Sequence, residues 1–182
     1  YDAMVVRSRT KVPKEVIDAA DNLKIVVRGG VGLDNIDVPY AQSKGVQVRN
    51  TPKASSNSVA ELALGYMLAL ARRVPQASAS MAAGEWKKKQ LKGTEIAGKT
   101  LGLVGFGNIG SLLGEKASAL GMDVIFYRRS PTDVSFARQV DLDELLAESD
   151  FISLHVPKTP ETTNLIDAEA FARMKDGVFI VQ

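Results

Sequence analysis

Residues 105–110 carry glycines at a spacing that suits phosphate binding. The segment reads Gly105-Phe106-Gly107-Asn108-Ile109-Gly110, and it follows an apolar run and opens a helical pattern. The first glycine permits a tight turn, the second lets the backbone approach a pyrophosphate, and the third allows the helix to pack closely on the strand. The helix N-terminus adds oriented N–H donors. The pattern predicts a dinucleotide site at Gly105, Gly107, Asn108, Ile109 and Gly110; a glycine-rich turn without a ligand is the alternative.

Residues 128–130 lie where the choice between NAD and NADP is normally made. An Asp or Glu about 20 residues beyond the glycine segment bonds the ribose 2′-hydroxyl of NAD, whereas an Arg accommodates the 2′-phosphate of NADP. Here the apolar run 124–127 leads into Arg128-Arg129-Ser130, and no carboxylate occupies this turn. A guanidinium holds a phosphate through charge-assisted hydrogen bonds. We therefore predict NADP as the cofactor, with NAD and two solvent-facing arginines as the alternative.

His155 is the only histidine, and it follows a strand-like run close to where the dinucleotide should lie. As a general base it would need a carboxylate that orients its second ring nitrogen. The nearest preceding acid, Asp150, lies about 16 Å away at the other end of the run, at about 3.3 Å per residue. We therefore interpret His155 as a structural or cofactor-lining residue. The chain has no cysteine, which excludes a zinc–thiolate site, and no metal site is expected.

Strand-like and helical patterns alternate along the chain, which predicts an α/β fold with a doubly wound parallel sheet of the Rossmann type. The expected strands are 3–6, 24–27, 46–49, 100–104, 123–127, 151–156 and 178–181. The expected helices are 14–22, 38–44, 58–81, 109–120, 142–148 (capped by Asp141) and 168–174.

The helix expected at 58–81 is the longest. Ser58 and Glu61 have capping-box spacing, and most of the following residues are Ala, Leu or Met. A helix that is apolar around most of its circumference is buried, often against a partner subunit. Pro52 interrupts the chain shortly before it. We therefore divide the chain into a partial domain at 1–53 and a second domain at 54–182, which contains this helix and a core at 99–182.

Composition excludes several classes of protein. Hydrophobic residues make up 45% and charged residues 24%, as is usual for globular proteins. No apolar run approaches the roughly 18–20 residues of a membrane span, and a net charge of +2 does not favour nucleic-acid binding. The absence of cysteine adds weak support for a cytoplasmic location, which we expect. The chain starts and stops within strand-like runs, so we expect a piece excised from a longer protein.

Further motifs occur in order along the chain: residues 28–37 (RGGVGLDNID), 50–52 (NTP), 58–61 (SVAE), 98–100 (GKT) and 153–162 (SLHVPKTPET). Together with the glycine segment they resemble the D-isomer-specific 2-hydroxyacid dehydrogenases over essentially the whole chain. Residues 6–12 and 84–86 are most similar to the D-3-phosphoglycerate dehydrogenases of that family.

The resemblance implies a smaller, flavodoxin-like substrate domain, represented by residues 1–53, and an NAD(P)-binding domain. In the family a His removes the hydroxyl proton of a D-2-hydroxy acid as hydride passes to nicotinamide, a Glu orients that His, and an Arg binds the substrate carboxylate. This Arg, Glu and His are expected beyond Gln182. The 182-residue chain is therefore expected to bind the dinucleotide without appreciable turnover.

The resemblance also carries over individual residues. His155, Val156, Pro157 and Thr162 match positions beside the cofactor. The candidate substrate-binding residues are Arg7, Arg9, Gly30, Val31, Gly32 and Asn50; exposed arginines, a simple turn at 30–32 and a turn role for Asn50 are the alternatives. The helix at 58–81 builds a dimer interface in the family, so a homodimer is expected. Trp86 is expected to anchor its own loop, and reaching into a partner's active site is the alternative.

Three functions follow as candidates. The first is oxidation of 3-phosphoglycerate, which feeds serine biosynthesis. The second is an NADPH-dependent glyoxylate or hydroxypyruvate reductase, which Arg128-Arg129-Ser130 would suit. The third, from another class, is an NAD(H)-responsive binding protein without catalysis. The expected partners are a small 2-hydroxy or 2-oxo acid and a second copy of the chain, and neither nucleic acid nor membrane.

Overall fold

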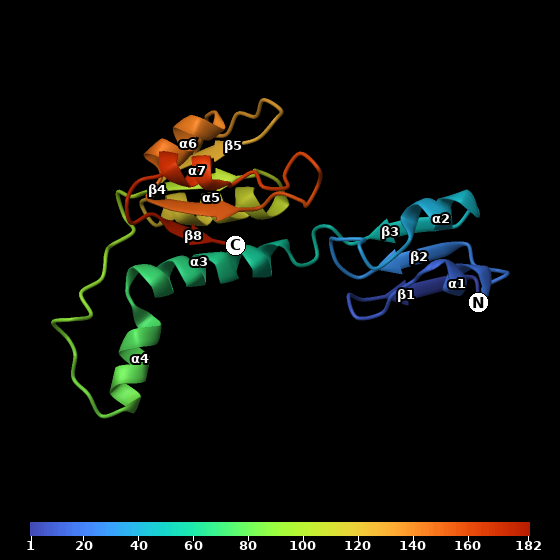
Figure 1. Ribbon diagram of the computed structural model, residues 1–182, viewed down its shortest axis with the longest axis horizontal. Helices are drawn as coiled ribbons and strands as arrows, with labels where there is room; N and C mark the ends of the chain where they lie inside the picture. Colours follow the sequence, from blue (N-terminus) through green and yellow to red (C-terminus); the bar gives the residue numbers. More distant parts are fainter. The chain divides into compact units, whose positions relative to one another are not determined.

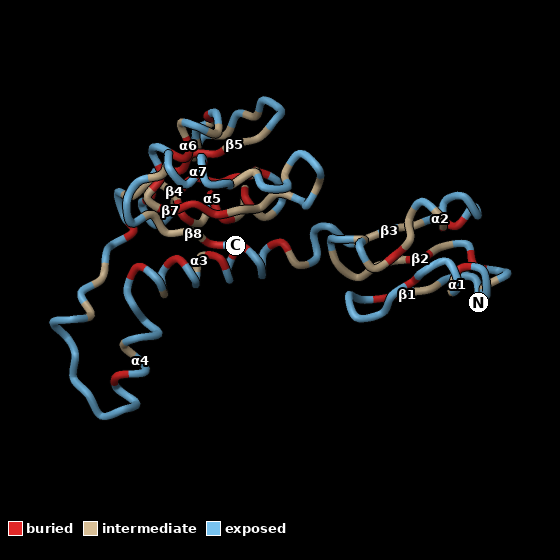
Figure 2. Tube along the Cα trace, in the orientation of Figure 1, coloured by how far each residue is buried: buried red, intermediate tan, exposed pale blue.

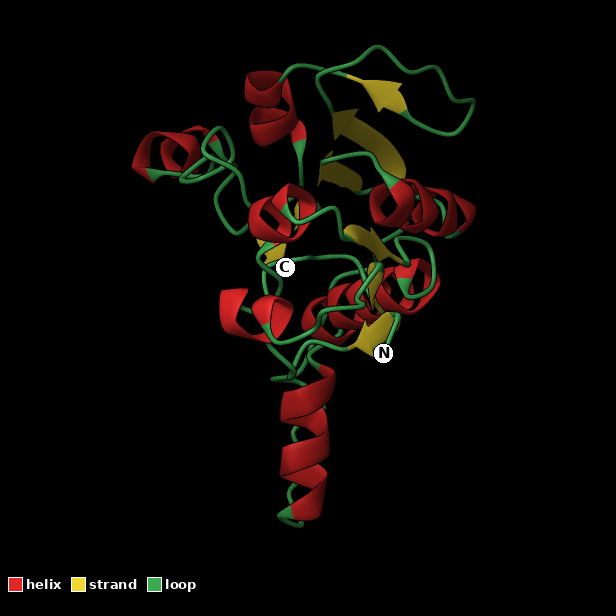
Figure 3. Cartoon of the chain, turned by 90° about the vertical axis from the view of Figure 1, so that its right-hand side faces the viewer, coloured by secondary structure: helices red, strands yellow, loops and turns green.

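The computed structural model describes all 182 residues and divides them into two compact units, Tyr1–Ser56 and Asn57–Gln182. Both units contain helices and strands (Figure 3), which alternate along the chain except where α4 follows α3 and β6 follows β5. All strand pairs are parallel, so the predicted α/β class is confirmed. No helix combines the length and the apolar character that crossing a bilayer requires.

The first unit is a three-stranded sheet with two short helices. Its elements are β1 (Ala3–Val6), α1 (Lys14–Asp18), β2 (Ile25–Arg28), α2 (Val38–Ser43) and β3 (Gln47–Asn50), and the strand order is β1-β2-β3. The Asp37 side chain caps α2 by accepting a hydrogen bond from the N–H of Tyr40 at 3.1 Å. The core of this unit is a separate cluster around Val12, Val26 and Ala41, which are fully buried.

The second unit is built on a five-stranded sheet. Its elements are α3 (Ser56–Ala71), α4 (Val74–Ala82), β4 (Thr100–Val104), α5 (Asn108–Ala119), β5 (Asp123–Tyr127), β6 (Arg138–Gln139), α6 (Leu142–Glu148), β7 (Phe151–Leu154), α7 (Ala168–Arg173) and β8 (Phe179–Val181) (Figure 1). The strand order is β6-β5-β4-β7-β8. The chain runs outward from β4 first to one side and then to the other, so β4 and β7 flank the switch point where doubly wound folds bind ligands.

Side chains of the central strand alternate between two cores. Leu101 and Leu103 pack with α3 and α5, whereas Val104 packs with α6 and α7 on the opposite face. Gly102 also faces α6, where an added Cβ would lie 2.7 Å from a Leu145 methyl carbon. Period-two alternation with apolar residues on both faces requires helices on both sides of the sheet.

The single helix predicted at 58–81 is wrong: the structure has two helices, α3 and α4, that meet at Arg72 and Arg73. Pro75 lies in the first turn of α4. In a continuous helix its ring would clash with the carbonyl of Ala71, four residues earlier, so α3 ends there. Arg73 turns the chain with a left-handed backbone at φ 53°.

The predicted capping box at Ser58 is also wrong, because α3 starts at Ser56 and Ser58 lies inside it. Glu61 instead accepts a hydrogen bond from the Asn57 side chain at 2.7 Å. Buried positions recur along α3 (Figure 2). Ala60, Ala63 and Met67 are the buried residues of α3 that belong to the core. Leu62 and Tyr66 are 55% and 49% exposed, so within this chain α3 buries one face only.

Trp86 is 78% exposed, so the expectation that it anchors its own loop is wrong.

Candidate functional site

The glycine segment forms the turn between β4 and α5. Gly105 has φ 98°, a left-handed conformation that suits glycine, and its N–H donates to the carbonyl of Tyr127 at 3.0 Å. A Cβ on Gly110 would lie 2.2 Å from the Gly105 carbonyl oxygen, so this glycine allows the close approach of helix and strand. A Cβ on Gly107 would meet no atom within 4 Å. Gly107 thus leaves open space in which a pyrophosphate could lie against the protein backbone.

The N-terminus of α5 offers unpaired donors beside that space. Gly107 occupies the N-cap position, no side chain caps the helix, and the first hydrogen bond runs from the N–H of Ser111 to the carbonyl of Gly107 at 3.0 Å. The N–H groups of Asn108, Ile109 and Gly110 therefore have no partner within the helix. Together with the helix dipole they suit an anion such as a pyrophosphate. The residues present fit the dinucleotide that the sequence predicts.

A cleft of about 330 Å³ lies at the carboxyl ends of β4, β5 and β7. It is lined by the glycine turn, by the turn after β5 and by the segment after β7: Gly105, Phe106, Gly107, Tyr127, Arg128, Arg129, Ser130, His155, Val156, Pro157, Thr159, Glu161, Thr162 and Leu165. The structure thus brings together the three segments that the sequence assigned to the cofactor. Asn108, Ile109 and Gly110 do not line the cleft and lie beside it in the first turn of α5.

Five lining residues were not predicted: Phe106, Tyr127, Thr159, Glu161 and Leu165. All lie inside or next to the predicted segments, so extending each motif by a few residues would have included them. Phe106 stacks on Phe126 with ring centroids 3.8 Å apart, which makes it part of both the cleft wall and the core.

Charges of both signs face the cleft. The Arg128 guanidinium donates to the carbonyl of Phe106 at 3.4 Å, which directs it toward the glycine turn. Arg129 lies near Glu161: a hydrogen bond from Thr159 and, more weakly, the charge of Arg129 hold the pKa of Glu161 below its usual value. An ionised Glu161 would oppose a 2′-phosphate, whereas the two arginines would attract one.

His155 ends the strand segment and contacts a hydroxyl rather than a carboxylate. Its Nε2 lies 2.9 Å from the Oγ of Ser153, two residues earlier on the same face of β7. Burial lowers the pKa of His155, which favours the neutral ring. Asp150 is engaged elsewhere, accepting hydrogen bonds from the N–H of Thr100 at 2.9 Å and from Lys175 at 3.3 Å.

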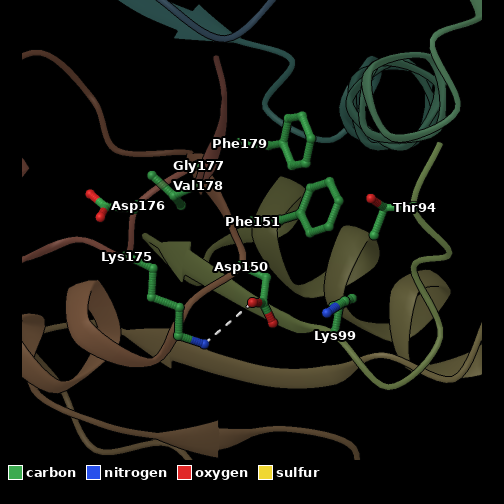
Figure 4. A pocket seen from close by; sticks show the side chains of 9 residues that line it. All are labelled: Thr94, Lys99, Asp150, Phe151, Lys175, Asp176, Gly177, Val178 and Phe179. Carbon is green, nitrogen blue, oxygen red and sulfur yellow. Dashed lines mark hydrogen bonds and ion pairs between the residues drawn. The ribbon is translucent and has the colours of Figure 1, made fainter. Parts of the chain in front are cut away.

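Asp150 also lines a second hollow, of about 160 Å³, together with Lys99, Lys175 and Phe179 (Figure 4). Lys99 and Asp150 directly precede β4 and β7, so this hollow lies at the amino ends of the strands. The glycine turn lies at the carboxyl ends. The two hollows are therefore separate, and this one is not part of the dinucleotide cleft.

In the first unit the candidate substrate residues share the carboxyl edge of the three-stranded sheet. Arg7 and Arg9 follow β1, Gly30, Val31 and Gly32 follow β2, and Asn50 ends β3. The Asn50 side chain donates to the carbonyl of Val31 at 2.6 Å and so holds the glycine turn, which fits the turn role left open for it. No hydrogen bond links the Arg7 or Arg9 side chain to this turn.

Arg28 is a residue of this edge that the sequence did not single out. Its guanidinium donates to the hydroxyl of Ser8 at 3.0 Å, while its Nε is buried without a partner. Gly30 has φ 151°, a backbone conformation that side-chain-bearing residues rarely adopt, which explains the glycine at that position.

A family model described as "D-isomer specific 2-hydroxyacid dehydrogenase, NAD binding domain" matches residues 64–182. The chain belongs to this family. The chain is 56% identical to a hydroxypyruvate reductase of Thermotoga maritima, over 99% of this chain and 59% of the relative. It is 50% identical to a D-3-phosphoglycerate dehydrogenase of Methanocaldococcus jannaschii, over 99% of this chain and 35% of the relative.

Solved structures agree with this membership. An NAD-dependent formate dehydrogenase from Staphylococcus aureus in complex with NAD has a TM-score of 0.86 and 32% identity, covering 98% of this chain and 56% of its own. An acyclic imino acid reductase in complex with NADPH and D-Arg has a TM-score of 0.85 and 32% identity, covering 96% of this chain and 57% of its own. The fold of residues 64–182 is thus that of an NAD-binding domain, and both forms of the cofactor occur among its structural neighbours.

Proposed function

We propose that the chain binds NADP or NAD in the cleft of its second unit and belongs to an oxidoreductase that acts on a D-2-hydroxy acid. The observation that carries this proposal is the meeting of three separate predicted segments around one cleft. In this proposal residues 54–182 form the cofactor domain and residues 1–53 belong to the substrate domain. Isothermal titration calorimetry with NADPH and NADH tests it: binding of one molecule per chain is expected, and no binding of either at millimolar concentration would refute it.

Each wall of the cleft has a part in this proposal. The N–H groups at the start of α5 bind the pyrophosphate, and Arg128, Arg129 and Ser130 face the adenosine ribose. His155, Val156, Pro157 and Thr162 form the opposite wall and exclude water from the cofactor. A dinucleotide held there would supply the hydride chemistry through its nicotinamide ring. At the edge of the first unit, Arg7, Arg9, the turn Gly30-Val31-Gly32 and Asn50 hold the acid.

Arg128 favours NADP over NAD as the preferred cofactor. One charge-assisted hydrogen bond contributes about 1.5–3 kcal/mol, which corresponds to roughly tenfold or more in affinity. Arg128→Gln is expected to weaken NADPH binding by about that factor and to leave NADH binding nearly unchanged. Arg173→Gln, at an exposed arginine of α7 that pairs with Asp143, is the matched control. A wild-type chain that prefers NADH would overturn the NADP assignment.

We propose 3-phosphoglycerate as the substrate of the whole enzyme, with a place in serine biosynthesis and a cytoplasmic location. Arg7 and Arg9 at the sheet edge and the D-3-phosphoglycerate dehydrogenase relatives support this substrate. Hydroxypyruvate or glyoxylate is the second candidate, favoured by the 56% identity to the Thermotoga maritima hydroxypyruvate reductase and by the arginines of the cleft. The ratio of kcat/KM for 3-phosphoglycerate and for hydroxypyruvate, measured on the whole enzyme, decides between them.

The 182-residue chain is proposed to bind the cofactor without appreciable turnover. Its one histidine contacts a serine hydroxyl and no carboxylate, so it lacks the orienting partner that a general base needs. Absorbance of reduced nicotinamide in the presence of 3-phosphoglycerate tests this, and robust turnover would contradict it. If the whole enzyme also binds cofactor tightly but turns over neither candidate acid, the NAD(H)-responsive binding role is favoured.

A homodimer is proposed through the exposed face of α3 and α4. Val59, Leu62, Tyr66 and Leu70 lie three or four residues apart on one face of α3 and are exposed, as are Val74 and Met81 on α4. A contiguous apolar face of this kind marks an interaction site. Light scattering is expected to give twice the chain mass for the wild type and the mass of one chain for Leu62→Lys/Tyr66→Lys. A monomeric wild type would refute the proposal.

A further inference from the structure

The turn after β5 depends on a single side chain from the neighbouring strand. The carboxamide of Gln139, in β6, donates to the carbonyl of Arg128 at 2.9 Å and to the carbonyl of Ser130 at 3.3 Å. It also accepts a hydrogen bond from the N–H of Thr132 at 2.8 Å. One side chain thus bonds three main-chain groups of residues 128–132.

Little else holds this turn. No backbone-to-backbone hydrogen bond involves residues 129–133, and Pro131 has no N–H to donate. The only other hydrogen bond from the turn is that of the Arg128 guanidinium to the Phe106 carbonyl. Gln139 thus supplies all the hydrogen bonds to main-chain groups of residues 128–132.

Gln139 is itself held firmly. It lies opposite Phe126 in the register of β5 and β6, and the N–H of Val140 donates to the Phe126 carbonyl at 2.9 Å. Its neighbour Arg138 pairs with Glu144 and Glu148 of α6. The carboxamide therefore acts from a rigid strand on a turn that has no hydrogen-bonded structure of its own.

We propose that Gln139 is a positioning residue that sets the discrimination between NAD and NADP. This inference rests on the proposed dinucleotide cleft, whose wall includes Arg128, Arg129 and Ser130. Gln139 does not line the cleft. It fixes the two carbonyls on either side of Arg129, and so the directions in which both guanidinium groups and the Ser130 hydroxyl point. A binding group gains affinity when it is held in the bound geometry beforehand.

The chemistry of the carboxamide is specific. Only a primary amide supplies both the donors for two carbonyls and the acceptor for one N–H. Gln139→Met keeps the length of the side chain and removes all three bonds. Gln139→Glu keeps the acceptor for Thr132 and removes both donors. Gln47→Met is the matched control, because it makes the same exchange at an exposed glutamine of strand β3 that forms no side-chain hydrogen bond.

The test is the ratio of the dissociation constants for NADH and NADPH, measured by calorimetry on the 182-residue chain and its variants. Whichever cofactor the wild type prefers, Gln139→Met is expected to move this ratio toward one by about fivefold or more, about 1 kcal/mol. Gln139→Glu also brings a negative charge beside Arg128, which opposes a 2′-phosphate, so it is expected to shift the ratio toward NADH whichever cofactor the wild type prefers. Gln47→Met is expected to stay within about twofold of the wild type. An unchanged ratio in a Gln139→Met chain that still binds both cofactors would overturn the inference and leave the cofactor site standing.

A measurement on the wild type guards against variants that fail to fold. Hydrogen exchange at the Thr132 amide is expected to be slower than at the neighbouring Asp133 amide, which has no partner. Equal exchange at both would show that Gln139 does not hold the turn. Failure of the wild type to bind either dinucleotide would count against the cofactor site itself.

Discussion

Arg128 and Glu161 bring opposite charges to the cleft. Arg128 and the ionised Glu161 face the same space, and Arg129 lies near Glu161. The position of Arg128 at the cleft was predictable because it follows a strand at a known distance from the glycine segment. Glu161 was not assigned to the site, although Pro157 and Thr162 on either side of it were. The segment after β7 has no regular period, so the sequence indicates that it lies near the cofactor site but not which of its side chains face the cleft.

His155 gives the folded state a pH dependence with a defined sign. Burial lowers its pKa below the ordinary value of 6.5, so the unfolded chain binds the proton more tightly than the folded chain. As pH falls from about 7 toward 5, protonation favours the unfolded state and the free energy of unfolding decreases.

Urea unfolding at several pH values measures this effect. The decrease between about pH 7 and pH 5 is expected to be smaller in His155→Asn, because Asn does not titrate. Asp18 and Asp150 have pKa values below the ordinary value of 3.8. Their ionised forms therefore stabilise the folded chain above pH 3.8, and this stabilisation is lost as the pH falls through the pKa values of the folded state. Identical pH profiles for His155→Asn and the wild type would contradict the account.

At the scale of elements, most strands and helices of residues 99–182 follow from the sequence, whereas the break between α3 and α4 was missed although Pro75 is a local signal for it. The apolar alternation and caps of residues 99–182 are local signals, and the Asp141 side chain accepts from the N–H of Glu144 at 2.8 Å as expected. β6 was missed because Arg138 and Gln139 are polar and the strand has two residues. Its pairing with β5 depends on contacts distant in sequence, which periodicity does not reveal.

The glycine turn yields a prediction that separates binding from folding. Gly107→Ala adds a methyl group into open space, so the melting temperature should stay within about 2 °C of the wild type while dinucleotide affinity falls by about tenfold or more. Gly110→Ala would force a Cβ against the Gly105 carbonyl and is expected to lower stability by about 1–3 kcal/mol. Thermal unfolding and calorimetry on Gly107→Ala and Gly110→Ala check these two expectations. Undiminished dinucleotide affinity in Gly107→Ala would argue against a pyrophosphate beside Gly107.

The break between α3 and α4 carries a conformational cost at Arg73. A non-glycine residue with φ 53° pays about 1 kcal/mol for the left-handed conformation. Arg73→Gly is expected to stabilise the chain by somewhat less than that, because glycine also gains freedom in the unfolded state. Arg72→Gly, next to it and without positive φ, should destabilise instead. Denaturant unfolding measures both variants. If Arg73→Gly and Arg72→Gly change the free energy of unfolding equally, the left-handed backbone at Arg73 carries no conformational cost.

At the scale of the whole molecule, the two units have separate hydrophobic cores. The structure divides between Ser56 and Asn57. The sequence places its boundary after residue 53, because Pro52 interrupts the chain just beyond the strand-like run 46–49.

Separate cores predict separate local stabilities. Val26 is fully buried in the first unit, and Val26→Ala should cost about 2 kcal/mol there. Hydrogen exchange is expected to accelerate at the amides of β1 to β3 and to stay unchanged at Leu103 in β4. Equal acceleration in both units would mean that they unfold as one.

The central claim is that the cleft of the second unit binds a dinucleotide. Amide chemical shifts of the chain, recorded by NMR during titration with NADPH, test it most directly. Saturable shifts concentrated at residues 105–110, 128–130 and 155–162 are expected if the cofactor binds in this cleft. Saturating shifts located elsewhere, or no shifts at millimolar NADPH or NADH, would contradict the claim.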